Sequence, residues 1–150
     1  MKNNQSRFEI LQEEIEKMHL LTSSRSKENK KKAFRIYITI AVSTAIVTIL
    51  VAIGDDLTSN TTAIKILTLF FSALSTVLAA WDGFYNHKQL WVNYGESRDN
   101  LKELLLKVKL VSDEEKNNTD FLIKTHKEFQ SIIDKGNYKW KELRIDENNG

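Results

Sequence analysis

The chain has 150 residues, 28% of them charged, and a formal net charge of only +2, so its length fits one domain and the placement of charge matters more than the sum. It contains no cysteine, which excludes disulfides, thiol nucleophiles and thiolate metal sites. It has no proline and only five glycines, so long helices are permitted and the sequence predicts an all-α protein.

An amphipathic helix and a basic flank are predicted over residues 6–32. Ser6 and Glu9 have the spacing of a capping box. The apolar positions that follow recur at helical spacing: Phe8, Leu11, Ile15 and Met18. The hydroxyl-rich cluster from Thr22 to Ser26 is expected to break or re-cap this helix before the next one. The basic flank consists of Arg25, Lys27, Lys30, Lys31, Lys32 and Arg35.

Residues 36–54 form an apolar run without a charged side chain. As a helix this run is long enough to cross a hydrocarbon core of about 30 Å, and its hydroxyls can bond to the helix's own carbonyls. A buried helix of a soluble protein would normally show a polar stripe. A signal peptide would follow a shorter and less charged leading segment. We therefore interpret the run as a retained first span.

A second apolar run extends from Ile64 to Trp81, and the predicted second span covers residues 64–84. Lys65 lies near its start, where a long side chain can reach the headgroups. The connection, residues 55–62, is too short for a domain and rich in turn formers, so the spans should be antiparallel neighbours. The predicted fold class is an all-α membrane protein: a two-transmembrane helical hairpin with N-terminal and long C-terminal cytoplasmic helices.

Charge and aromatic placement predict the orientation of the hairpin. The basic flank precedes the first span, whereas Asp55 and Asp56 follow it, which favours a cytoplasmic location for both termini. Aromatic side chains suited to the membrane interface are Phe34, Tyr37, Trp81, Trp91 and Tyr94. The basic flank is also compatible with nucleic-acid binding, but beside an apolar span attraction to anionic membrane lipid is the simpler interpretation. Direct nucleic-acid binding is not expected.

Two further cytoplasmic helices are predicted, over residues 86–111 and 113–135. The first can continue directly from the second span and carries the apolar stripe Leu90, Tyr94, Leu101, Leu104, Leu105 and Val108. A capping box at Ser112 and Glu115 begins the last helix, and Gly136 with Asn137 should end it. Its apolar side consists of Phe121, Leu122, Phe129, Ile132 and Ile133. The tail after this helix should fray. These stripes need to pack on each other, on another subunit, or on both.

The sequence contains no recognisable catalytic or cofactor-binding pattern. Its three histidines, His19, His87 and His126, match no metal-ligand spacing, and there is no phosphate loop or nucleophile elbow. The paired carboxylates Asp55–Asp56 and Glu114–Glu115 sit at a loop or a helix start, where acidic residues are favoured electrostatically. We expect neither an enzyme nor a cofactor.

Small and hydroxyl-bearing residues repeat along one face of the second span: Thr68, Ser72, Ser75 and Ala79. The first span repeats the same steps of four, three and four at Ala41, Ala45, Thr48 and Ala52. One interpretation is close packing of helices, because small residues let backbones approach. The other is that, after oligomerisation, the face of the second span lines a narrow aqueous path with Asp82 at its inner mouth. Both interpretations stay open.

The segment WDGFYNHKQLWVNYGESRDNLKELL, at the end of the second span and after it, resembles the SLATT group, the SMODS- and SLOG-associating two-transmembrane effector domains of bacteria. The resemblance covers nearly the whole chain as one domain over residues 1–150. Positions that fit the group's helix after the membrane are Trp91, Tyr94, Asp99, Leu101 and Lys102. Gly95 stands where a basic residue is common, and Leu104 where an acidic residue is common.

The resemblance implies an effector of bacterial antiphage or other conflict systems in the inner (cell) membrane. Such an effector oligomerises and forms a pore or disrupts the membrane on activation. The implied signal comes from a nucleotide second-messenger synthase or sensor, or from a polymerase-like partner protein. The alternative is a passive membrane anchor or scaffold whose cytoplasmic helices hold a partner enzyme.

Overall fold

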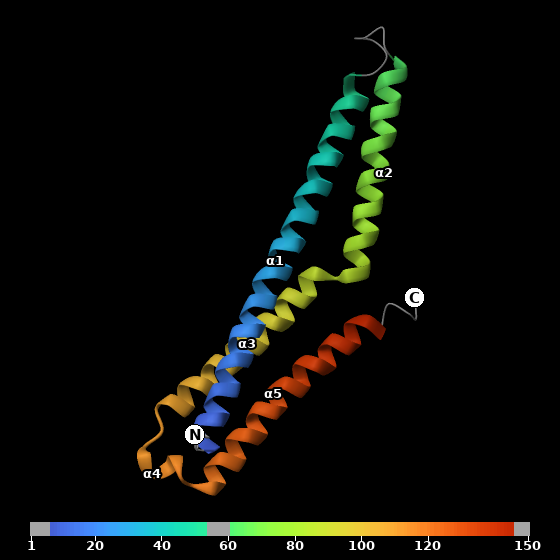
Figure 1. Cartoon of the computed structure of the whole chain (residues 1–150). Helices are drawn as coiled ribbons and strands as arrows, with labels where there is room; N and C mark the ends of the chain where they lie inside the picture. The colour runs from blue at the N-terminus through green and yellow to red at the C-terminus, as the bar shows by residue number, and fades with distance from the viewer. Residues whose placement is uncertain (1–6, 54–60, 146–150) are drawn as a thin grey trace, which may run out of the picture. The chain divides into compact units, whose positions relative to one another are not determined.

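The computed structural model describes residues 7–53 and 61–145, and these residues form five helices without a strand (Figure 1). The helices are α1 (Arg7–Ile53), α2 (Thr61–Tyr85), α3 (His87–Lys109), α4 (Asp113–Lys116) and α5 (Thr119–Ile145). The prediction of an all-α chain is therefore confirmed for the described residues. The contacts divide the chain into a hairpin unit, residues 30–87, and a helical module, residues 7–29 and 88–145.

In the hairpin unit, the second part of α1 and all of α2 lie antiparallel (Figure 1). Less exposed residues recur at steps of three and four along both helices, which marks the seam between them. On α1 the seam consists of Ile36, Ile40, Ser43, Val47 and Leu50. On α2 it consists of Ile64, Thr68, Phe71, Ser75, Leu78 and Asp82.

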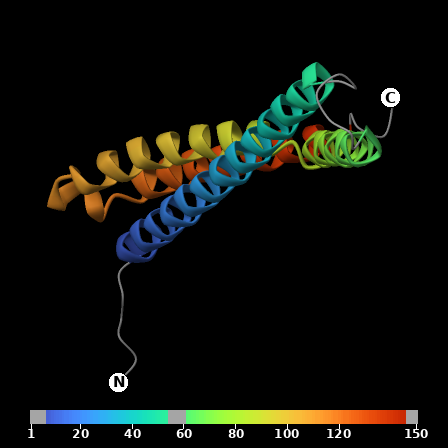
Figure 2. The same ribbon diagram turned by 90° about the horizontal axis from the view of Figure 1, so that it is seen from above.

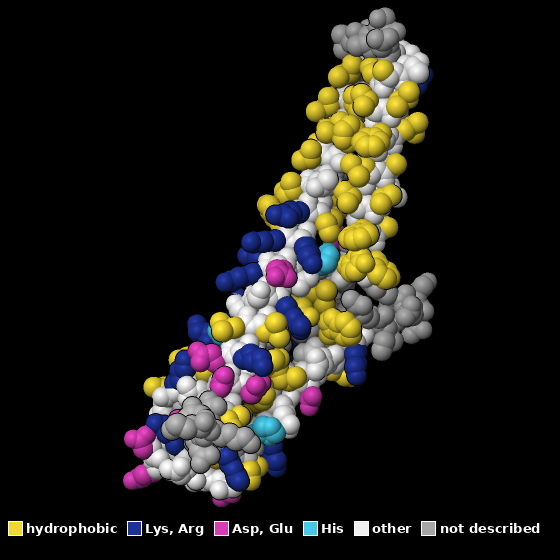
Figure 3. Space-filling view, in the orientation of Figure 1, with side chains coloured by type: hydrophobic (Ala, Val, Ile, Leu, Met, Phe, Trp, Pro, Cys, Tyr) yellow, Lys and Arg dark blue, Asp and Glu magenta, His cyan; other side chains and the backbone are white. Residues whose placement is uncertain are grey.

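The outer surface of the hairpin unit is apolar (Figure 3). No residue of α2 is buried, and Leu69 and Phe70 are 70% and 59% exposed. Both helices are long and apolar enough to cross a membrane. A core helix of a soluble protein would be mostly buried, whereas only 6% of the apolar window in α1 is buried. The hairpin is thus not covered by the described residues of its own chain.

Six hydroxyls of the hairpin unit bond to carbonyls of their own helices. Thr39 donates to the carbonyl of Arg35 at 2.8 Å, and Thr68 donates to that of Ile64 at 2.8 Å. The same bond to the residue four positions earlier is made by Thr44, Thr48, Ser75 and Thr76. The predicted bonding of Thr39, Thr44 and Thr48 to their own helix is confirmed, and these hydroxyls cost little in an apolar surrounding.

The helical module packs the first part of α1 against α3 and α5. Its core joins Phe8 and Ile15 of α1 to Leu104, Leu105 and Val108 of α3. Partly buried side chains that pack on this core are Leu11, Val111, Phe121, Leu122, Phe129 and Ile132. The predicted apolar stripes are therefore confirmed as the surfaces that meet, and they meet within one chain.

The expected break at Thr22–Ser26 is wrong, because α1 runs without interruption from Arg7 to Ile53. The Thr22 hydroxyl donates to the carbonyl of Met18 at 2.8 Å, inside the helix. Ser26 is buried and donates to the carbonyl of Trp91 on α3 at 3.3 Å. These hydroxyls serve helix packing, so the residues 6–32 and 36–54 predicted as separate elements belong, where described, to one helix.

The chain does not continue as a helix from α2 into α3. Asn86 separates them with φ of 44°, and its backbone N–H donates to the carbonyl of Asp82 at 2.7 Å. Asparagine tolerates this left-handed conformation better than most residues, so it ends the helix without a glycine. The fourth predicted helix, residues 86–111, is observed as His87–Lys109.

The last predicted helix, residues 113–135, is also corrected. Ser112 accepts from the backbone N–H of Glu115, as its capping box predicts, but it caps only the short α4. Asn118 then accepts from the backbone N–H of Asp120 at 2.9 Å and begins α5. That helix passes through Gly136 and Asn137 to Ile145, because this stretch packs on α3 and the packing outweighs the low helix propensity of glycine.

Several predictions lie outside the described residues. They concern the capping serine Ser6, the end of the first apolar run at Gly54, most of the connection at 55–62 with Asp55 and Asp56, and the tail after Ile145.

Candidate functional site

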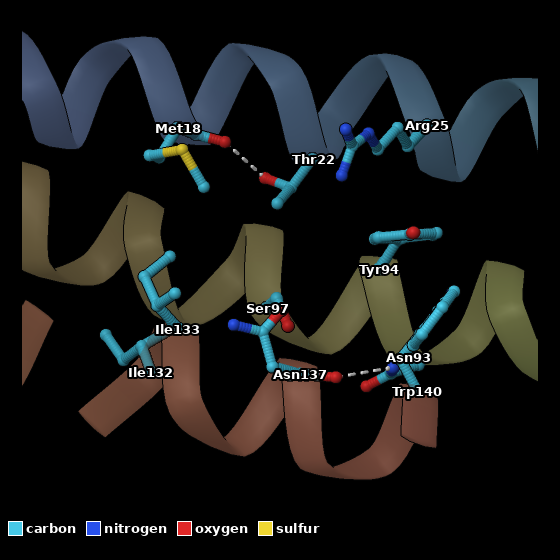
Figure 4. A pocket seen from close by; sticks show the side chains of 11 residues that line it. Met18, Thr22, Arg25, Asn93, Tyr94, Ser97, Ile132, Ile133, Asn137 and Trp140 are labelled. Atoms are coloured by element: carbon cyan, nitrogen blue, oxygen red, sulfur yellow. Dashed lines mark hydrogen bonds between the residues drawn. The ribbon is translucent and has the colours of Figure 1, made fainter. Parts of the chain in front are cut away.

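A cleft of about 370 Å³ opens in the helical module where α1, α3 and α5 meet (Figure 4). α1 contributes Met18, Thr22 and Arg25, and α3 contributes Asn93, Tyr94 and Ser97. The lining from α5 consists of Ile132, Ile133, Gly136, Asn137 and Trp140. This volume lies in the range of small-molecule sites, about 300–1,000 Å³.

Small residues bring the three helices together at the cleft. A Cβ added at Gly95 would lie 3.7 Å from the Ser26 hydroxyl, and one added at Gly136 would lie 2.9 Å from the Ser97 hydroxyl. The buried Asn93 side chain donates to the carbonyl of Gly136 at 3.2 Å. This bond fixes α5 against α3 at the floor of the cleft.

Among the residues that the structure describes, Arg25 is the only charged one that lines the cleft. Its guanidinium lies over the ring of Tyr94, 5.8 Å from the ring centroid (Figure 4). This cation–π contact holds the charge at the rim without neutralising it. The cleft therefore combines one cation, two aromatic rings, an apolar wall of isoleucines and several amide or hydroxyl groups.

Acidic charge near the cleft is held on the other side of α3. Glu96 accepts hydrogen bonds from Lys135, at 2.8 Å, and from Lys139, both on α5. These two bonds lower the pKa of Glu96 from its usual 4.5 to about 2. Glu96 stays charged and paired, so it does not cancel the charge of Arg25 in the cleft.

The hydroxyl-bearing face predicted on α2 straddles the edge of the hairpin seam. Thr68 and Ser75 are partly buried, whereas Ser72 and Ala79 are exposed. Helical periodicity extends the exposed part of this face to Thr76 and Gly83, which is open around its Cα. On α1, the repeat of Ala41, Ala45, Thr48 and Ala52 is exposed throughout and lies opposite the seam.

Asp82 and His87 lie near each other at the end of the hairpin unit. One carboxylate oxygen of Asp82 is buried without a hydrogen-bond partner among the described residues. Burial lowers the pKa of His87, the charge of Lys32 lowers it further, and the charge of Asp82 opposes both. The ring of His87 stacks on that of Tyr85, with centroids 5.5 Å apart.

The predicted interface residues fall into two groups. Phe34, Tyr37 and Trp81 are exposed in the hairpin unit, whereas Trp91 and Tyr94 are partly buried in the helical module. In the basic flank, Arg25 lines the cleft. The others are exposed along α1: Lys27, Lys30, Lys31, Lys32 and Arg35. On the face shown in Figure 3, Lys and Arg gather along α1 next to the apolar surface of the hairpin.

Sequence reasoning did not identify the cleft. Asn93, Ser97 and Trp140 were not singled out as site residues, and Gly136 with Asn137 was interpreted as a helix end. The available signal was the small size of Gly95 and Gly136 within apolar repeats, because a glycine inside a helix commonly marks a close helix contact. In the part of the chain that the structure describes, no cluster of three His, Asp or Glu side chains is arranged for a metal ion.

Fold and site together define a class: helical proteins in which an apolar, uncovered two-helix hairpin is joined to a three-helix module with a mixed polar and aromatic cleft. The chain belongs to DUF4231, a family described as proteins of unknown function, whose profile matches residues 19–106. The match includes Thr22 and Arg25 of α1 and the α3 wall of the cleft, and it ends before α5. None of the curated proteins and none of the solved structures compared with the chain matches it.

Proposed function

We propose that the chain is a two-transmembrane effector of the bacterial inner membrane, which oligomerises and makes that membrane permeable when a signal or partner engages its cytoplasmic module. The observation that carries the proposal is the uncovered hairpin. Two long apolar helices expose large side chains such as Leu69 and Phe70, and lipid is the surrounding that would cover them. The effector role itself is drawn from the resemblance to the SLATT group.

Charge supports the proposed orientation. The basic residues exposed along α1 are suited to anionic headgroups on the cytoplasmic side, and each is worth about 1 kcal/mol near such a surface. Both termini are then cytoplasmic. The chain has no cysteine, so single cysteines placed in the helical module and near the α1–α2 connection report their side by labelling in intact cells. Labelling of the module from outside would contradict the orientation.

Assembly of several copies follows from geometry, because one hairpin cannot enclose a path. The hairpin leaves the small residues of α1 and the outer part of the α2 face, including Ser72 and Ala79, without a neighbour. Small residues allow backbones of neighbouring copies to approach, and the hydroxyls of α2 are available to line an aqueous path. Asp82 would lie at the inner mouth of this path.

Dye release from liposomes containing the purified protein tests the leak. Ser72→Leu, on the exposed part of the face, should reduce release at least several-fold while insertion is unchanged. Ala73→Leu is the matched control, because it adds a similar bulk to another exposed position of the same helix. Ser75→Leu is less informative, since Ser75 is partly buried against α1.

Equal release by the wild type and both variants would contradict the assignment of this face. Liposomes that stay intact under activating conditions, in the presence of a candidate nucleotide or partner, would favour the scaffold alternative. That alternative is supported by the packed module with its cleft, which offers binding surface without requiring conduction. Grafting the module onto an unrelated anchor would then preserve function.

A further inference from the structure

Most residues that line the cleft of the helical module lie outside its apolar core, although Ile132 also packs against that core. The core of Ile15, Leu104 and Val108 lies further along the bundle, whereas the cleft carries amides, hydroxyls, rings and one guanidinium. A site with an apolar wall and a few convergent polar groups is the usual form of a small-molecule site.

The positive charge in the cleft favours a ligand of negative charge. Among the described residues, Arg25 is the only charged one that lines the cleft, and the carboxylate of Glu96 nearby is paired with Lys135 and Lys139. The Arg25 guanidinium lies over the Tyr94 ring, 5.8 Å from its centroid, and this contact uses none of its N–H groups in a conventional hydrogen bond. An anionic group at the rim would therefore gain charge-assisted hydrogen bonds.

The rings and the apolar wall indicate the chemistry of the uncharged part of the ligand. Tyr94 lies on α3 and Trp140, 37% exposed, on α5, so the two rings line the cleft from different helices (Figure 4). Ile132 and Ile133, which also lie on α5, form the apolar wall of the cleft. A flat aromatic group fits between such surfaces by stacking, and the amide of Asn137 can bond to its edge.

We infer that this cleft binds a small anion that carries a flat aromatic ring, with the acidic group on Arg25 and the ring against Tyr94 and Trp140. Two sources share this chemistry: aromatic carboxylates and nucleoside monophosphates. The inference concerns the helical module alone and does not depend on the proposed leak, so either can fail without the other.

Isothermal titration calorimetry on the full chain in detergent micelles tests the inference. The probes are indole-3-acetate and adenosine monophosphate, each compared with its neutral counterpart, indole or adenosine, and with inorganic phosphate. The wild type should bind at least one ring-bearing anion saturably, at least tenfold tighter than the neutral counterpart and inorganic phosphate. The probe that binds identifies the source as carboxylate or nucleotide.

Arg25→Gln should weaken this binding about tenfold or more, because it removes the charge and keeps a long polar side chain. Lys27→Gln is the matched control: it removes a positive charge from an exposed site on α1 outside the cleft and should leave binding within twofold. Asn137→Phe keeps Arg25 and fills the cleft, so it should abolish binding. If Arg25→Gln loses helicity, Asn137→Phe takes its place as the test.

Three results would overturn the inference. One is the absence of saturable binding of both anions up to millimolar concentration. Another is equal affinity for an anion and its neutral counterpart. The third is a failure of the variants to affect binding as expected: either Asn137→Phe still binds the anion, or Arg25→Gln weakens binding no more than Lys27→Gln does.

Discussion

Thr125 places a hydroxyl inside the helical module, where only 1% of the residue is exposed and its Oγ1 has no hydrogen-bond partner among the described residues. An unsatisfied buried hydroxyl costs about 1–3 kcal/mol relative to an apolar group of the same shape. Thr125→Val should therefore raise the free energy of unfolding of the module by about 1 kcal/mol. Urea unfolding in detergent, followed by circular dichroism, measures this change.

Thr22→Val provides the contrast for this prediction. Thr22 is also buried, but its hydroxyl donates to the carbonyls of Met18 and His19, so valine relieves no unsatisfied group. This variant should be neutral or destabilising by up to about 1 kcal/mol. If Thr125→Val stabilised the module no more than Thr22→Val, the Thr125 hydroxyl would have a partner in solution.

Glu96 predicts how the module responds to acid. Hydrogen bonds from Lys135 and Lys139 lower its pKa to about 2, below its usual 4.5. Because the folded-state pKa is depressed, the stabilisation is fully present above pH 4.5 and is lost as the pH falls towards 2. Glu96→Gln should lower stability at neutral pH and make its decline between these pH values shallower, as measured by urea midpoints.

The effect of Glu96 should be small, because its side chain is 39% exposed and solvent screens the two pairs. Asp99 and Asp113, whose pKa values are also lowered, keep part of the acid sensitivity in the variant. Glu103→Gln is the control, an exposed carboxylate on the same helix. If stability fell as steeply with decreasing pH in Glu96→Gln as in Glu103→Gln, the assigned role of Glu96 would be contradicted.

At the scale of elements, the crossing of α3 and α5 depends on Gly136. Alanine raises helix propensity by about 1 kcal/mol over glycine, but its Cβ would lie 2.9 Å from the Ser97 hydroxyl. Gly136→Ala should therefore raise the free energy of unfolding by less than about 1 kcal/mol in the wild type. In a Ser97→Ala background it should give most of that increase. A double-mutant cycle of unfolding free energies should show coupling of at least about 0.5 kcal/mol. Additive effects would mean that Ser97 turns away at no cost.

The sequence predicted the helices that depend on apolar periodicity. The stripes with Ile15, Leu104 and Phe129 and the two apolar runs are repeated along each helix, so local pattern alone was sufficient. Positions where a small polar residue packs against a distant helix were misread. Ser26 appeared to break α1, and its partner, the carbonyl of Trp91, is not visible in local sequence.

Because sequence patterns are local, they also predicted only part of the candidate site. The face at Ser72 and Ala79 was found because its spacing is regular within one helix. The cleft was not found, because Arg25, Asn93 and Trp140 come from three helices and meet only after packing. Arg25 was interpreted through its neighbours in sequence, as part of a basic flank, whereas its neighbour in space is Tyr94.

At the scale of the whole molecule, the two units are stabilised by different surroundings. The helical module buries its own core. The hairpin unit buries no residue of α2, so under the proposed membrane location its stability comes from lipid or detergent and from backbone bonds within each helix. Urea acts mainly on surface that becomes exposed to water on unfolding. The units should therefore respond to urea separately, although α1 runs through both.

This separation predicts two transitions when the full chain in detergent is unfolded by urea. Trp91→Phe with Trp140→Phe leaves Trp81 as the reporter of the hairpin, and Trp81→Phe leaves the two reporters of the module. Module fluorescence should change at a lower urea concentration than that of Trp81, and helical circular dichroism should fall in two steps. Trp140 should follow Trp91, because both belong to the helical module. Coincident changes at all three tryptophans would mean that the hairpin is held by the module and not by the apolar solvent, and the proposed membrane location would lose its physical basis.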